Sequence, residues 1–174
     1  MFLSNRTIKE YIESGKITVV GEINIETTGL SLHLGNELLI PKPNQTFDTH
    51  KGVIPEYDKY DLTQSTYILK PNSFVLGVSK QNIKTDKDII TFIDGRSTYA
   101  RVGMTVHISA MVLDGLPFNS ENSVLEIKNL GNCDIVLHQN EKIGTYLFAQ
   151  LSTAIDGEKD SIYTNQTTVT PPII

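Results

Sequence analysis

Residues 123–128 read SVLEIK, and the alternation of their side chains decides the fold class. Successive side chains of a β-strand point to opposite faces, so the serine, leucine and isoleucine of this stretch would share one face. The opposite face would carry the valine, the lysine and a carboxylate, Glu126. The stretch therefore predicts a half-buried strand with an acidic residue in its middle.

Eight other short stretches have the same character, because they are rich in Val, Ile and Tyr and are separated by Gly, Asn, Pro and Asp. They are residues 17–20, 30–34, 37–40, 65–70, 73–79, 105–113, 133–138 and 144–151. The stretch 105–113 is expected to place on one face Val106, Ile108, Ala110 and Val112. Such a series predicts a mainly-β sandwich, jelly roll or distorted barrel rather than alternating strands and helices.

Only the beginning of the chain is typical of a helix. Thr7 and Glu10 form an S/T-x-x-E capping box, and Gly15 is expected to end the helix. Residues 41–64 are rich in Pro, Asp and Lys and predict a long loop with some local structure. The pattern thus favours a short N-terminal helix followed by strands.

The domain organisation is expected to be simple. With no internal repeat and no compositional boundary, residues 1–174 are predicted to form one domain. Residues 152–174 contain many Ser, Thr and Asn and few core-type residues. We expect this segment to be a tail that closes over the active site or docks on a partner subunit.

Composition excludes several classes of function. The net charge is −5 and basic residues form no run, which argues against a nucleic-acid polymer as partner. No apolar stretch is long enough for a spanning helix and the polar N-terminus does not resemble a signal peptide, so we expect a cytoplasmic protein. The single cysteine and four histidines contain no CxxC, HxE or PCxxC pattern, so no zinc site is expected.

The most informative stretch for chemistry is 92–103, FIDGRSTYARVG. If 97–102 forms one helical turn, free backbone N–H groups, two hydroxyls and two guanidiniums would converge on one volume. Such a volume suits a polyphosphate. The alternative is a turn with two solvated arginines.

Several stretches together resemble the dCTP deaminases, a branch of the dUTPase-like superfamily. FIDGRSTYARVGMTVHISAMVLD resembles the GRSSxARxG block and its following strand, and SVLEIKN resembles the segment that holds the catalytic glutamate. TGLSLHLGN, GTYLFAQLS and the opening MFLSNRTIKEYIESGKI are also similar to family segments, in the same order. The resemblance implies a distorted β-barrel or jelly-roll subunit that assembles as a homotrimer, with active sites shared between subunits.

The resemblance also implies roles for four catalytic residues. Glu126 matches the glutamate that takes a proton from water and later returns it, without a metal. Ser97 matches the serine that helps hold the water or the exocyclic amine, and Arg101 the arginine that supports that site. Asp114 matches the aspartate near the ribose 3′-hydroxyl, which in dUTPases and bifunctional relatives activates water for phosphate cleavage.

A larger set matches nucleotide contacts. Arg96 and Thr98 match phosphate contacts, and the Ser109–Ala110 step matches the backbone that meets the base. Including the residues named above, the implied nucleotide-binding set is Arg96, Ser97, Thr98, Ser109, Ala110, Asp114, Val124, Tyr163 and Gln166. The family implies Mg²⁺ bound through the substrate triphosphate and no zinc.

Some residues depart from the family pattern. Ser31 and His33 stand where Asp and Arg are expected, and Ile162 replaces a tail lysine whose place Lys159 could take. The 115–123 loop lacks the usual DPGWxG or DPGFxG turn and is about two residues longer. These departures leave substrate identity open among cytosine, uracil and modified pyrimidines.

Two alternatives to a dCTP deaminase remain at this point. One is a dUTP diphosphatase, and the other is a homologue that binds nucleotide without turnover. A purely structural role also remains open for three of these residues. Glu126 would pair with Lys128, Asp114 would be a turn residue, and Ala110 would allow close packing. The presence of Glu126 within VLEIKN favours the deaminase, with possible continuation to dUMP and diphosphate.

Overall fold

The structure is a computed structural model that describes residues 1–118, 120–157, 163 and 166–174. Its two helices are α1 (Asn5–Glu13) and α2 (Ser97–Ala100). Its strands are β1 (Ile17–Val20), β2 (Leu30–Pro41), β3 (Tyr57–Asp61), β4 (Tyr67–Leu69), β5 (Phe74–Thr85), β6 (Ile89–Gly95), β7 (Met104–Thr105), β8 (Val112–Leu113), β9 (Glu121–Asn129), β10 (Ile135–Leu137) and β11 (Lys142–Gln150).

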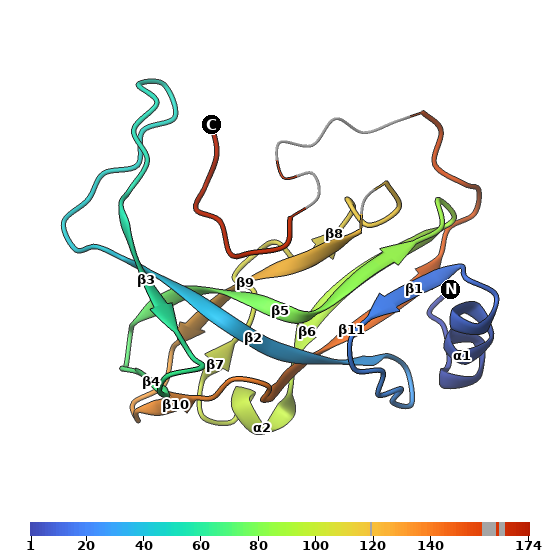
Figure 1. The fold of residues 1–174 in the computed structure, drawn as a ribbon, viewed down its shortest axis with the longest axis horizontal. Coiled ribbons are helices and arrows are strands. Elements are labelled where there is room, and N and C mark those ends of the chain that lie inside the picture. The colour runs from blue at the N-terminus through green and yellow to red at the C-terminus, as the bar shows by residue number, and fades with distance from the viewer. Residues whose placement is uncertain (119, 158–162, 164–165) are drawn as a thin grey trace.

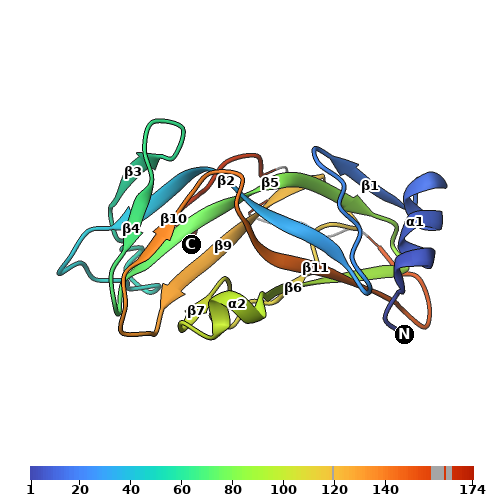
Figure 2. The same cartoon turned by 90° about the horizontal axis from the view of Figure 1, so that it is seen from below.

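Nine strands form one antiparallel sheet in the order β7-β9-β5-β2-β11-β6-β8, with β1 added beside β5 and β3 beside β2. Strands β10 and β4 form a separate antiparallel pair. The large sheet curls into a half-barrel, as the two views in Figure 1 and Figure 2 show. The expected mainly-β fold with a short N-terminal helix is confirmed.

The hydrophobic core lies inside the curl of the sheet. Tyr146 and Phe148 on β11 are fully buried, and they belong to one cluster with Leu32 on β2 and Ile127 on β9. Along β9, and around Tyr146 and Phe148 on β11, buried residues alternate with more exposed neighbours, whereas residues 30–35 of β2 are buried without a break. The same alternation leaves Glu126 half-buried between Leu125 and Ile127, both 0% exposed.

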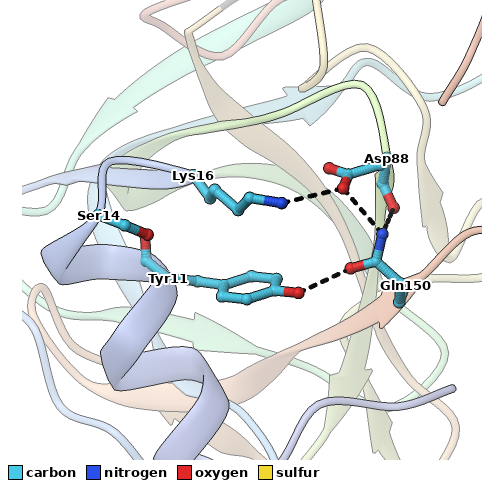
Figure 3. Close-up of polar contacts among 5 residues, drawn as sticks. All are labelled: Tyr11, Ser14, Lys16, Asp88 and Gln150. Atoms are coloured by element: carbon cyan, nitrogen blue, oxygen red, sulfur yellow. Dashed lines mark hydrogen bonds and ion pairs between the residues drawn. The ribbon is translucent and has the colours of Figure 1, made fainter.

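Polar contacts attach α1 and the residue before β1 to the end of β11 and to Asp88, which precedes β6 (Figure 3). The Tyr11 hydroxyl donates to Gln150 Oε1 at 2.9 Å, and Gln150 Nε2 donates to Asp88 Oδ2 at 2.9 Å. Lys16 Nζ lies 3.1 Å from the same carboxylate oxygen. Hydrogen bonding from Gln150 and then Lys16 lowers the pKa of Asp88, so this carboxylate stays ionised in the folded chain.

Several expected elements differ in detail from the structure. The stretches 30–34 and 37–40 are parts of one strand, whose pairing register with β5 shifts between Leu34 and Leu38. The N-cap of α1 is Ser4 rather than Thr7. Strands β3 and β6 were not predicted as strands.

The prediction of one strand over 105–113 is wrong. Only β7 and β8 are strands there, and residues 106–111 between them are irregular. Ile108 is 56% exposed whereas Val106 is 1% exposed, so these residues do not share a buried face. The backbone departs from strand geometry where Ile108 N–H donates to the Glu126 side chain instead of a neighbouring strand.

Candidate active site

Glu126 lies near the middle of β9, opposite Leu76 on β5. Its backbone N–H donates to Val106 O at 3.0 Å, and its carboxylate Oε2 accepts the backbone N–H of Ile108 at 2.8 Å. A hydrogen bond from a backbone donor fixes the orientation of the carboxylate. In the described part of the chain, Glu126 does not pair with Lys128, which instead donates to the backbone oxygen of Asn72.

A cavity of about 300 Å³ opens beside Glu126. Six of the predicted site residues line it: Ala110, Asp114, Val124, Glu126, Tyr163 and Gln166. The structure thus brings together residues that are up to 56 positions apart in the sequence. Its walls also include several residues that sequence analysis missed, among them Leu76, Glu121, Ser123, Thr170, Pro171 and Pro172.

The C-terminal segment forms one wall of this cavity. Gln166 O accepts the backbone N–H of Asn122 at 2.8 Å, which attaches the segment to β9. Val169 is 3% exposed and packs in a small cluster with Leu39, Leu76 and Val78. Apolar burial and a backbone hydrogen bond therefore hold this part of the tail against its own subunit.

Tyr163 makes a contact within the C-terminal segment. Its hydroxyl accepts the backbone N–H of Ile173 at 3.1 Å. The predicted departure at Ile162, and Lys159 as its substitute, lie outside the described residues.

Glu126 also lines a second cavity, of about 400 Å³. It shares Leu76, Glu126 and Pro172 with the first cavity, and Ser109, another predicted site residue, lines it. Aromatic side chains form much of its wall: Phe47, Tyr57 and Phe74. Glu126 therefore lines both the cavity that contains Asp114 and Glu121 and the cavity with the aromatic wall.

The remaining predicted residues lie on α2 or beside it, away from both cavities. Ser97, Thr98 and Arg101 are exposed, and none of them lines either cavity. Arg96, half-buried, donates from Nη1 to Lys142 O at 3.3 Å. Figure 1 shows α2 and the C-terminal segment on opposite sides of the sheet. The expected helical turn is confirmed, but the predicted site residues form two separate groups in one subunit.

Ser31 and His33, the two residues of β2 that depart from the family pattern, have partners that sequence analysis did not identify. Ser31 Oγ donates to Glu26 Oε1 at 2.8 Å, and Glu26 also pairs with Lys142. His33 Nδ1 lies 2.6 Å from Gln81 Nε2, and burial lowers the pKa of this imidazole. Neutral and paired groups thus occupy the positions where the family pattern has Asp and Arg.

The beginning of β9 and the loop before it bring another carboxylate, Glu121, to the site. Leu116 is 2% exposed and its backbone oxygen accepts the N–H of Thr85 at 3.1 Å, which anchors the loop. The Glu121 carboxylate then lies against Gly115, where an added Cβ would come within 2.6 Å of Glu121 Oε1. The cavity consequently contains three carboxylates, from Asp114, Glu121 and Glu126.

The described residues offer neither a cluster of metal ligands nor a membrane-spanning helix. Residues 1–118, 120–157, 163 and 166–174 contain no group of three or more His, Cys, Asp or Glu side chains placed to hold a metal ion. Over the same residues, neither helix has the length and apolar character needed to cross a membrane.

Solved structures with a similar fold define the class. The chain superposes on 2′-deoxycytidine 5′-triphosphate deaminase from Agrobacterium tumefaciens with a TM-score of 0.62 and 15% identity, covering 84% of this chain and 47% of that one. The chain thus spans about half the length of that structure. An EIAV dUTPase structure gives a TM-score of 0.52 at 12% identity, covering 84% of this chain and 98% of that one. The fold is therefore the one that dUTPase and dCTP deaminase structures share.

A family model described as dCTP deaminase-like matches residues 2–151. The chain therefore belongs to the dCTP deaminase-like family. Among curated relatives, it is 28% identical to a "dCTP deaminase, dUMP-forming" of Methanobrevibacter smithii, over 87% of this chain and 81% of the relative. It is 27% identical to a "dCTP deaminase" of Natronomonas pharaonis, over 96% of this chain and 91% of the relative.

Proposed function

We propose that this protein is an enzyme that hydrolyses dCTP to dUTP and ammonia, and then dUTP to dUMP and diphosphate. The observation that carries the proposal is the Glu126 carboxylate, held at 2.8 Å by the Ile108 N–H beside a cavity that Asp114 also lines. Relatives named dCTP deaminase, several of them dUMP-forming, support both steps.

Glu126 is proposed to carry the proton in the first step. In the described residues Oε2 is occupied by the Ile108 N–H, which leaves Oε1 to accept a proton from water. Glu126 passes the proton that it takes from water to N3, as the water oxygen bonds to C4 of cytosine and the C4–N3 double bond opens. Glu126 then takes the proton of the new C4 hydroxyl and delivers it to the amino group, so the C4–N4 bond breaks, ammonia leaves and the C4 carbonyl of uracil forms.

Asp114 is proposed to serve the second step. It lines the same cavity as Glu126, at the end of β8, so one bound nucleotide could meet both carboxylates. A carboxylate can orient and deprotonate a second water, whose oxygen attacks the α-phosphorus. The bond between the α-phosphorus and the bridging oxygen breaks, which yields dUMP and diphosphate.

The active site is proposed to be shared between copies of the chain in a homotrimer. Ser97, Thr98 and Arg101 are exposed and do not line the cavity of their own subunit. The cavity contains three carboxylates and, among its described lining residues, no Lys or Arg, which is unfavourable for a triphosphate. A neighbouring copy that presents α2 would bring the cations and hydroxyls that the cavity lacks.

Mg²⁺ is proposed to enter with the substrate. Oxygen ligands from phosphates suit Mg²⁺, which usually binds proteins through few carboxylates and keeps several waters. Asp114 and Glu121 are the described cavity side chains that could contact waters of such an ion. The ion would neutralise phosphate charge, while proton transfer would remain with Glu126.

The test is a panel of dCTP, dUTP, dCMP and dTTP, each with Mg²⁺, followed by nucleotide chromatography and separate assays of ammonia and diphosphate. We expect ammonia and dUMP from dCTP, and dUMP with diphosphate from dUTP. Diphosphate from dUTP with dCTP untouched would instead identify a dUTP diphosphatase. Tight binding in calorimetry with no product would overturn the enzymatic proposal.

A further inference from the structure

Tyr99 differs from the residues around it on α2. Ser97, Thr98, Ala100 and Arg101 are exposed, whereas Tyr99 is half-buried and packs against the main hydrophobic core. The short helix therefore has a solvent face, which carries the groups proposed for catalysis, and an inner face, which carries an aromatic ring. Tyr99 occupies the variable position of the GRSTYARVG block, where no role was expected.

The phenol of Tyr99 donates a hydrogen bond to Glu141 Oε1. Burial and this hydrogen bond raise the pKa of Tyr99, so the hydroxyl remains a donor over the physiological range. A phenol that donates to a carboxylate is a charge-assisted hydrogen bond, which is stronger than a neutral one. The contact links α2 to the turn that precedes β11.

Glu141 is itself held firmly by its surroundings. Its Oε2 accepts the backbone N–H of His138 at 3.4 Å, and its backbone oxygen accepts the N–H of Leu34 at 2.8 Å. The preceding Asn140 donates its N–H back to Leu34 O at 2.9 Å. The acceptor for Tyr99 is therefore attached to the backbone of β2, in the centre of the sheet.

The residue next to Glu141 holds the other end of the helix. Lys142 O accepts Arg96 Nη1 at 3.3 Å, and Arg96 is the N-cap residue of α2. Two consecutive residues, Glu141 before β11 and Lys142 at its beginning, thus contact the inner face and the beginning of the same helical turn. We call this pair of contacts the α2 clamp.

Helix α2 needs such external support because it has only four residues and its N-cap makes no side-chain hydrogen bond. Isolated helices of this length do not persist in water, because forming the first turn is unfavourable. The exposed side chains of Ser97 and Arg101 can keep fixed positions only if other contacts fix the backbone that carries them.

We infer that Tyr99 is a positioning residue whose hydrogen bond to Glu141 orients α2, and with it Ser97 and Arg101, for the active site of the neighbouring copy. The inference rests on the proposed function for its catalytic consequence. Its structural part, that the clamp orders residues 97–102, can be measured without turnover.

The kinetic test compares Tyr99→Phe, Glu141→Ala, Glu141→Gln and the double variant Tyr99→Phe/Glu141→Ala in dCTP deamination. Misplacement of catalytic groups by about 1 Å can lower rates about 100-fold, so we expect Tyr99→Phe to reduce kcat by about 10- to 100-fold with a smaller change in KM. Glu141→Gln keeps an acceptor oxygen and should retain most activity. The double variant should be no slower than the slower single variant, since both remove one interaction.

Tyr11→Phe is the matched control. It removes a phenol hydrogen bond to a neutral acceptor, Gln150 Oε1 at 2.9 Å, which joins α1 to the sheet (Figure 3). If the kinetic loss reflects only lost stability, Tyr11→Phe should slow deamination as much as Tyr99→Phe. We expect wild-type kcat for Tyr11→Phe, and an equal loss in both variants would overturn the inference. Wild-type kcat for Tyr99→Phe, or additive losses in the double variant, would also overturn it.

Hydrogen exchange separates this inference from the proposed function. Tyr99→Phe should accelerate amide exchange at residues 97–102, and Tyr11→Phe should leave exchange there unchanged. If the wild-type protein turns over no nucleotide yet shows this exchange pattern, the proposed function fails while the clamp stands. Unchanged exchange in Tyr99→Phe would overturn the clamp regardless of activity.

Discussion

The backbone N–H of Ile108 lies 2.8 Å from Oε2 of Glu126 and joins an irregular segment to the middle of β9. This contact explains why residues 106–111 are not a strand, although their side chains alternate in the sequence. It also orients the carboxylate towards a cavity that Asp114, Tyr163 and Gln166 line. The irregular backbone is thus part of the candidate active site, where local rules of sequence are often broken.

A shared active site predicts complementation between inactive variants. Glu126→Gln and Arg101→Ala should each be inactive alone. The first removes the proton carrier of the cavity from every copy, and the second removes the arginine beside α2 from every copy. If the two variants are coexpressed or refolded together, about a quarter of the sites in random cyclic trimers would combine an intact Glu126 with an intact Arg101. Deamination assays should therefore recover up to about a quarter of wild-type activity. Mixed oligomers without recovered activity would contradict a shared site.

Asp114 should separate the two proposed reactions. Asp114→Asn keeps the size of the side chain but removes the carboxylate that would activate the second water. We expect dUTP to accumulate from dCTP while ammonia release continues, with diphosphate formation reduced by about 100-fold or more. Chromatography of the nucleotides over time measures the ratio of dUTP to dUMP. An unchanged ratio would show that Asp114 does not take part in phosphate cleavage.

Gly103 is the last residue of the GRSTYARVG block, and we expect the stability of the fold to depend on it. Its φ is +86°, and an added Cβ would lie 2.5 Å from the backbone nitrogen of Gly131. Gly103→Ala should therefore lower the free energy of unfolding by about 2 kcal/mol or more in urea titrations. Gly52→Ala is the control, since Gly52 has φ +65° but no neighbouring atom within 4 Å. An equal loss of unfolding free energy in the two variants would contradict the claim that the close approach of the Gly131 backbone makes Gly103→Ala more destabilising.

His33 predicts a pH-dependent contribution to stability. Burial lowers its pKa below 6.5, and Lys80 and Arg96 act in the same direction while Glu22 opposes them. The unfolded chain therefore binds the proton more tightly than the folded one. The stability that comes from burying His33 in its neutral form is fully present above pH 6.5. It is lost as the pH falls from there through the lower pKa of His33 in the folded state.

His33→Gln should accordingly reduce the slope of the free energy of unfolding against pH just below 6.5. Urea titrations at several pH values measure that slope. The control is the exposed His50, where His50→Gln should leave the slope close to that of the wild type. A slope that is unchanged in His33→Gln would contradict the assignment to His33.

Much of the fold could be predicted from side-chain alternation, and the exceptions have physical causes. The stretch 17–20 coincides with β1, and 123–128 lies within β9 with the expected faces. Strand β6 contains the apolar run IITFI, which does not alternate, and β3 has the polar sequence YDKYD at the side of β2. Alternation selects half-buried strands and misses strands of both these kinds.

The candidate site could be predicted only as a set of residues. Glu126, Asp114, Val124 and Gln166 do line one cavity, but nothing in their order along the chain indicates that Arg101 lies elsewhere on the subunit. Glu121 was missed because the sequence at the beginning of β9 has no pattern that distinguishes a cavity-facing carboxylate from a solvated one. Such positions follow from tertiary contacts, here the packing of the loop through Leu116.

The most direct test of the account is ammonia release from dCTP by the wild-type protein and by Glu126→Gln, with binding of dCTP measured by calorimetry in parallel. Glu13→Gln, an exposed change on α1, serves as the control for preparation and assay. We predict that the wild type and Glu13→Gln release ammonia, whereas Glu126→Gln binds dCTP but releases ammonia at least about 100-fold more slowly. Ammonia release by Glu126→Gln at the wild-type rate would contradict the central claim that Glu126 carries the proton.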